Sequence, residues 1–85
     1  MDKPTIDDLV EIFGPRTETE EFKVFDNAIE AEFKGEYYTL FAQNREGYVV
    51  CELKIKGLKG TRKIRIALFE FEDLYGMLEL IGIEN

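Results

Sequence analysis

The strongest constraint on the fold is an alternation of apolar and polar residues that recurs between residues 28 and 69. It is clearest at 28–34, where Ile29, Ala31 and Phe33 lie on one side of the chain and mostly charged residues on the other. Successive side chains of a strand point to opposite faces of a sheet, so this period of two indicates strands with one buried face. Turns rich in Gly and Asn separate the alternating segments. We predict antiparallel strands at about 22–25, 28–34, 37–43, 48–56 and 62–69.

A helix is predicted on each side of this strand-rich region. The first, over residues 4–13, has Thr5 as a capping residue and apolar residues at i, i+3, i+4 and i+7. The second, over about 71–81, carries an apolar stripe. The stripe consists of Phe71, Leu74, Tyr75, Leu78 and Ile81.

Met77 and Leu80 lie outside that stripe, so the second helix is apolar over more than half of its circumference. A surface helix needs only one apolar stripe. Two interpretations stay open for the excess. Another part of the chain covers it, or Met77 and Leu80 form the interface of a homodimer.

These elements predict an α+β fold of two layers, with a four- or five-stranded antiparallel meander sheet packed by an N-terminal and a C-terminal helix. The chain of 85 residues is long enough for a single domain, 1–85, with one modest core. We expect a cytoplasmic protein without a membrane segment. The reasons are a single cysteine, the absence of a signal-peptide pattern and the absence of a long apolar run.

The number of residues in the turn between the strands at 37–43 and 48–56 decides whether Phe41 lies on the core face of the sheet or on the opposite face. A turn with an even number of residues places Phe41 on the face opposite the core, whereas a register slip of one residue buries it. We favour the even turn. Its expected cross-strand pairs are Ala42 with Val49, Leu40 with Cys51, and Tyr38 with Leu53.

Positive charge is concentrated in one part of a chain that is acidic overall, with a formal net charge of −7. No acidic residue occurs between Leu53 and Phe69, and this interval holds six of the eleven Lys and Arg residues. Two neighbouring strands are expected to place four of these cations on the face that points away from the core. They are Lys54, Lys56, Lys63 and Arg65.

The same face is expected to expose the aromatic side chains of Tyr37, Phe41 and Tyr48. Aromatic rings among Lys and Arg suit single-stranded nucleic acid, because bases stack on the rings while phosphates contact the cations. A competing interpretation is internal neutralisation of the basic strip by carboxylates on the same face. The candidates are Glu30, Glu32 and Glu52.

Catalytic signals are weak. The chain has no histidine, which is the commonest general base and a common metal ligand. Cys51 falls on a predicted core position without a group that could activate it. The sequence therefore predicts no enzyme activity, no cofactor and no metal site.

Part of the chain, residues 28–81, resembles a PUR repeat of the Pur-alpha family, a whirly-type domain that binds single-stranded nucleic acid. The resemblance rests on Tyr37-Tyr38, on Gln43-Asn44-Arg45-Glu46-Gly47-Tyr48 at the hairpin turn, on Ile64-Arg65-Ile66-Ala67-Leu68, and on Phe71-Glu72-Asp73-Leu74. It implies a four-stranded antiparallel sheet followed by a helix, and a sheet face that binds single strands. It also implies that Asn44 and Arg45 lie near the contact and that two repeats pair, here as a homodimer.

The resulting hypothesis is a domain that binds single-stranded nucleic acid on a basic, aromatic-bearing sheet face. The alternative is an acidic protein-interaction or regulatory module, for example a mimic of nucleic acid, that does not itself bind nucleic acid. The expected contact residues are Tyr37, Phe41, Asn44, Arg45, Tyr48, Lys54, Lys56, Lys63 and Arg65.

Overall fold

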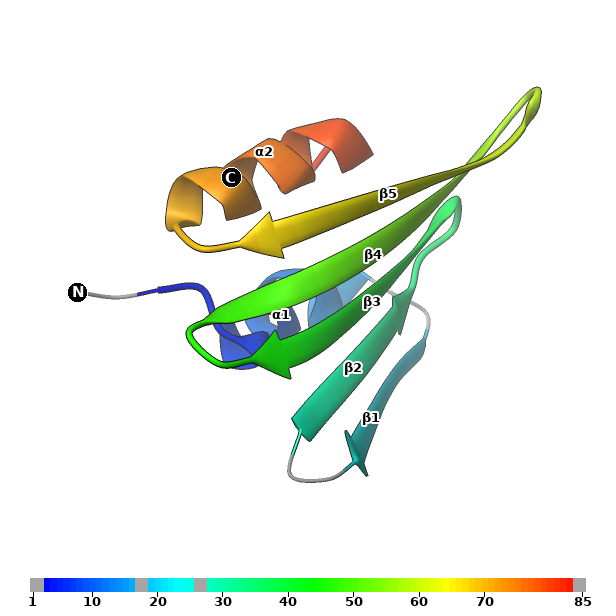
Figure 1. Ribbon diagram of the computed structural model, residues 1–85. Coiled ribbons are helices and arrows are strands. Elements are labelled where there is room, and N and C mark those ends of the chain that lie inside the picture. Colours follow the sequence, from blue (N-terminus) through cyan, green and yellow to red (C-terminus); the bar gives the residue numbers. More distant parts are fainter. Residues whose placement is uncertain (1–2, 17–18, 26–27, 84–85) are drawn as a thin grey trace.

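The computed structural model describes the backbone of residues 3–16, 19–25 and 28–83, and the side chains of residues 3–16 and 30–83 (Figure 1). Helix α1 (Ile6–Phe13) runs into a short 3-10 turn (Gly14–Arg16). Five strands and a final helix follow. They are β1 (Thr19–Phe25), β2 (Ala28–Lys34), β3 (Tyr38–Arg45), β4 (Tyr48–Gly57), β5 (Gly60–Leu68) and α2 (Phe71–Ile81).

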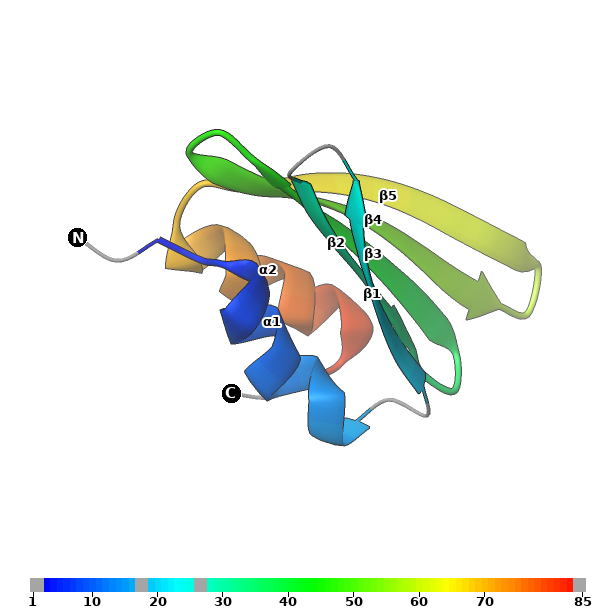
Figure 2. The same ribbon diagram turned by 90° about the horizontal axis from the view of Figure 1, so that it is seen from below.

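The strands form one antiparallel meander in the order β1-β2-β3-β4-β5, so each strand pairs with its neighbour in the chain. Figure 2 shows α1 and α2 side by side on the same face of this sheet, and neither of these described helices lies on the other face. The predicted two-layer α+β architecture is confirmed, and its sheet has five strands. We call the face without helices the open face.

The alternation in the sequence places apolar residues of the strands under the helices. Ala31 and Phe33 of β2, Leu40 of β3 and Leu53 of β4 are buried there. Burial of each large apolar side chain contributes about 1.5–3 kcal/mol. Both helices add to this core, α1 with Ile6, Leu9 and Phe13, and α2 with Leu74, Met77, Leu78 and Ile81.

Helix α1 starts as predicted from its capping residue. The Thr5 hydroxyl accepts a hydrogen bond from the Asp8 amide at 3.4 Å, and the Asp8 carboxylate accepts one from the Thr5 amide at 2.8 Å. This reciprocal capping box satisfies two amides that the helix leaves without a partner. The first residue in helical conformation is consequently Ile6, two residues after the predicted start.

The hairpin of β3 and β4 has the predicted faces but different partners. Its turn has two residues, Glu46 and Gly47, and Gly47 adopts a φ of 86°. A turn this tight extends both strands beyond the predicted four-residue loop, because glycine takes a positive φ without steric cost. The register is therefore shifted by two residues from the predicted pairs, which leaves Phe41 on the open face. The observed pairs are Tyr38 with Ile55, Leu40 with Leu53, and Ala42 with Cys51.

The predicted apolar stripe of α2 is wrong at two positions. Met77 is buried at 1% exposure within the core that both helices share with the sheet, whereas Tyr75 is 47% exposed. Met77 is therefore covered within the chain, and the interpretation that places it in a dimer interface is wrong for this residue. Leu80 is 52% exposed, so it alone of the expected dimer pair is available at the surface.

Candidate nucleic-acid interface

The open face of β3, β4 and β5 brings together five of the predicted contact residues. Cross-strand pairing places Lys54 of β4 opposite Lys63 of β5, and Glu52 between Phe41 of β3 and Arg65 of β5. Lys56 follows one pleat beyond Lys54. The face that sequence patterning predicted as basic is thus formed by neighbouring strands and lies away from the helices (Figure 2).

Phe41 is the aromatic centre of this face. Its side chain is 37% exposed, and the Lys54 ammonium lies 5.4 Å from the centroid of its ring. This distance permits a cation–π interaction, which is worth roughly 0.5–1 kcal/mol at an exposed site. An exposed ring beside a cation can accept a stacked base while the cation contacts a phosphate.

The carboxylates of the open face neutralise little of the basic strip. Glu32 pairs with Lys34 at 3.5 Å, and Glu30 accepts a hydrogen bond from the Gln43 amide at 2.9 Å. Among the described carboxylates, only Glu52 contacts a cation of the strip, Lys63, at 3.9 Å with both side chains well exposed. A long, exposed ion pair contributes about 0–1 kcal/mol.

Among the residues whose side chains are described, three cations of the strip therefore have no carboxylate partner. Within residues 3–16 and 30–83, no ion pair involves Lys54, Lys56 or Arg65. The Lys54–Lys63 neighbours in addition repel each other across the strands, which costs some tenths of a kcal/mol. Internal neutralisation by the described carboxylates, the competing explanation for the strip, accounts for Lys63 alone.

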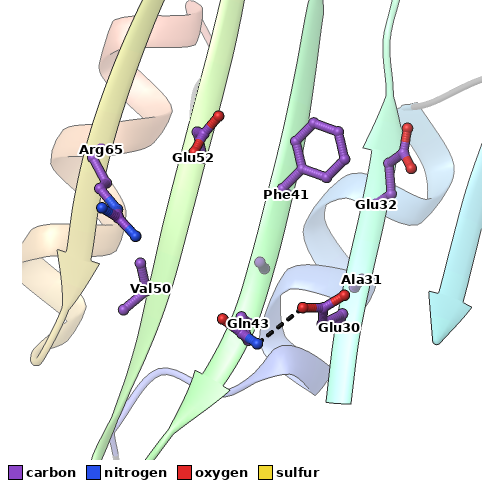
Figure 3. Close-up of a pocket in the computed structure, with 9 residues that line it drawn as sticks. Glu30, Ala31, Glu32, Phe41, Gln43, Val50, Glu52 and Arg65 are labelled. Atoms are coloured by element: carbon purple, nitrogen blue, oxygen red, sulfur yellow. Dashed lines mark hydrogen bonds between the residues drawn. The ribbon is translucent and has the colours of Figure 1, made fainter. Parts of the chain in front are cut away.

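A shallow hollow of about 180 Å³ crosses the middle of the open face (Figure 3). Figure 3 shows the Phe41 ring between Glu32 on one side and Glu52 on the other, with Arg65 reaching in from β5. The hollow has an acidic side on β2 and a basic side on β5. Its lining consists of Glu30, Ala31, Glu32, Phe41, Ala42, Gln43, Val50, Glu52 and Arg65.

A second group of predicted contact residues lies at the other end of the same strands. Asn44 and Arg45 are exposed at the turn between β3 and β4, and Arg45 pairs across the strands with Tyr48. The Tyr48 ring stacks on Phe69, with 4.6 Å between the ring centroids. Tyr48 and Lys54 are six residues apart on β4, which is about 20 Å along a strand.

Phe69 is an aromatic surface residue that the sequence patterns did not single out. It is 51% exposed and directly follows β5. The one sequence feature that could have identified Phe69 as a candidate contact residue is its position at the end of the interval without acidic residues. A base could therefore stack at this end of the sheet on either ring of the Tyr48–Phe69 pair.

The expectation that Tyr37 lies on the open face is wrong. Tyr37 precedes β3, and its hydroxyl donates a hydrogen bond to the carbonyl of Ile81 at the end of α2, in the helical layer. Its ring packs edge-on against Tyr38 at 5.4 Å. A carbonyl in the last turn of a helix lacks an intrahelical donor, and the Tyr37 hydroxyl supplies one. Tyr37 thus joins β3 to α2.

Cys51 has the environment of a packing residue. Its side chain is fully buried in the core, and burial raises the pKa of the thiol to about 12. The thiolate is the nucleophilic form of cysteine, so this thiol is unreactive near neutral pH.

Comparison of the chain with family models, with curated proteins and with solved structures finds no match. The resemblance to a PUR repeat accordingly stays a prediction. None of the described helices has the length and apolar character needed to cross a membrane. The class that the structure itself defines is a two-layer α+β domain with a five-stranded meander and an open sheet face.

Proposed function

We propose that the chain binds single-stranded nucleic acid on the open face of its sheet. The observation that carries the proposal is the position of Lys54, Lys56 and Arg65. These cations lack carboxylate partners among the described residues. They share with the exposed ring of Phe41 a sheet face that neither described helix covers, and Lys54 lies 5.4 Å from that ring. Phosphates of a bound strand would neutralise these cations, and a base would stack on the exposed ring of Phe41.

The charges on the face orient the bound strand. Glu32 and Glu52 flank Phe41 and repel phosphate, whereas Lys63 and Arg65 lie on β5. The sugar-phosphate backbone therefore runs on the β5 side of Glu52, past Lys63 and Arg65, and bases point toward β3 and Phe41. Such a path alongside β4 from Tyr48 to Lys56 spans eight residues, roughly 26 Å.

Removing positive charge from β5 tests the proposal. The double variant Lys63→Ala, Arg65→Ala is expected to bind a single-stranded oligonucleotide about 10- to 100-fold more weakly at 50 mM salt. Its slope of log affinity against log salt is expected to fall by about 1.4, because about 0.7 counterion is released per phosphate contact on a single strand. Fluorescence anisotropy across a salt series measures both quantities.

The double variant Lys3→Ala, Arg16→Ala is the matched control, since it also removes one Lys and one Arg, from exposed positions before and after α1 that lie off the open face. We expect it to change the affinity less than threefold. An equal loss in both double variants would show a response to net charge alone, and no loss in the β5 variant would contradict the proposal.

A second candidate function is a protein-interaction module, favoured by the acidic side of the hollow at Glu30 and Glu32 and by the net charge of −7. In that case the basic strip binds an acidic protein surface, or the acidic remainder imitates nucleic acid. Absence of oligonucleotide binding at low salt would favour this candidate. The homodimer that the PUR-repeat resemblance implies is a further proposal, for which α2 offers the exposed side chain of Leu80.

A further inference from the structure

Strands β4 and β5 continue beyond the rest of the sheet as a two-stranded arm, residues 56–63. The Lys56 amide of β4 donates a backbone hydrogen bond of 2.8 Å to the carbonyl of Tyr37, the residue just before β3. This bond marks the end of the contact between β4 and the β3 side of the sheet. Beyond it, β4 pairs only with β5, through Lys56 with Thr61 and Gly57 with Gly60. Figures 1 and 2 both show the tip of this hairpin projecting past the turn between β2 and β3.

Every residue of the arm is exposed to solvent. The arm carries four cations, Lys56, Lys59, Arg62 and Lys63, and no acidic residue. The charge of the arm is thus opposite in sign to that of the chain as a whole, which has a net charge of −7. A partner with dense negative charge is attracted to the arm and repelled by the acidic remainder, so the arm meets such a partner tip first.

The tip of the arm presents one apolar side chain. Leu58 and Lys59 form a two-residue turn between Gly57 and Gly60, and Gly60 adopts a φ of 127°. The Leu58 side chain is fully exposed, with no core contact. A single exposed leucine is ordinary on a protein surface. Here it occupies the most protruding point of a basic hairpin, where a partner's apolar group can contact it.

We propose that the arm binds in the major groove of double-stranded DNA, with Leu58 against a thymine methyl group on the floor of the groove. The arm extends about 10 Å from Ile55 to its tip, and the groove is about 8.5 Å deep and 12 Å wide. A two-stranded ribbon fits that width, and its cations then reach the phosphates on both rims. The thymine methyl is the apolar group that this groove presents.

The geometry selects DNA over duplex RNA. The major groove of A-form RNA is too narrow and deep for side chains to read. The inference goes beyond binding of single strands by the open face, because it uses Leu58 and Lys59 at the tip of the arm, beyond the part of β4 that pairs with β3.

The test compares a thymine-containing duplex with the same duplex carrying deoxyuridine, which lacks only the methyl group. Wild-type protein is expected to bind the thymine duplex about fourfold more tightly, the effect of burying one methyl group. Leu58→Ala is expected to bind the thymine duplex several-fold more weakly and to show no preference between the two duplexes. Because Leu58 has no core contact, this variant folds normally.

A charge variant tests the other half of the proposal. Lys59→Ala is expected to weaken duplex binding and to reduce the salt slope by about 0.9, whereas Lys3→Ala leaves the slope unchanged. The proposal is overturned by absence of duplex binding at low salt, or by a thymine preference that persists in Leu58→Ala. A single-stranded probe run with the same proteins separates the two proposals, since Leu58→Ala should leave that affinity within twofold.

Discussion

Replacing Met77 with alanine is expected to lower the free energy of unfolding by about 2–5 kcal/mol, the range for truncation of a large buried side chain. Met77 is 1% exposed and belongs to the core that α1, α2 and the sheet share. The truncation removes apolar burial and leaves a cavity between the two layers. Urea denaturation followed by circular dichroism measures the change.

Leu80→Ala is the matched control, because Leu80 lies on the same helix and is 52% exposed. Its free energy of unfolding is expected to change by about 0.5 kcal/mol or less, as for most surface substitutions. If Leu80→Ala destabilised the protein as much as Met77→Ala, in a manner that depended on protein concentration, Leu80 would be buried in an oligomer.

Replacing Phe41 with alanine is expected to weaken binding of a single-stranded oligonucleotide by about 5- to 150-fold, the effect of losing one base stacked on an aromatic ring. Phe41 is the exposed ring at the centre of the open face, with Lys54 beside it. The alanine variant keeps every cation, so its salt slope should match that of the wild type. Fluorescence anisotropy at fixed salt measures the affinity.

Phe41→Tyr provides the control, since it keeps an aromatic face at the same position. Its affinity is expected to stay within threefold of the wild type. Equal affinities for the alanine, tyrosine and wild-type proteins would remove Phe41 from the interface and leave a purely electrostatic contact.

The alternation in the sequence predicted β2 to β5 to within about two residues at each end, because burial of one sheet face imposes a period of two. The first strand was predicted too short, since β1 begins at Thr19, three residues before the predicted start. The alternation could not determine which residues pair across the hairpin of β3 and β4. A shift of two residues keeps every side chain on its face, so Ala42 opposite Val49 and Ala42 opposite Cys51 satisfy the same alternation. The turn decided between them, through the positive φ of Gly47.

The errors on α2 and Tyr37 share a cause. Helical periodicity allowed either Tyr75 or Met77 beside the central stripe, and only the packing of two helices on one sheet selected Met77. Likewise, alternation assigned Tyr37 to the open face, although β3 begins one residue later and leaves Tyr37 free to reach Ile81. Tertiary contacts at element ends, which carry no periodic signal, fixed both outcomes.

The basic strip was visible in the sequence as an interval without acidic residues, but its division into two parts was not. Sequence patterning placed Lys54, Lys63 and Arg65 on one face. It did not show that β4 and β5 extend beyond the end of β3. Because of this extension, Lys59 and Arg62 belong to a projecting arm. The length of each strand in a meander depends on the positions of the neighbouring turns, and the alternation of apolar and polar residues does not determine those positions.

Residue-resolved chemical-shift mapping with a single-stranded oligonucleotide at low salt tests the central claim most directly. Binding on the open face predicts the largest amide shifts at Phe41, Lys54 and Arg65, with small shifts in α1 and α2. Shifts confined to the two helices, or no shifts at all at millimolar oligonucleotide, would contradict the claim that the open sheet face binds single-stranded nucleic acid.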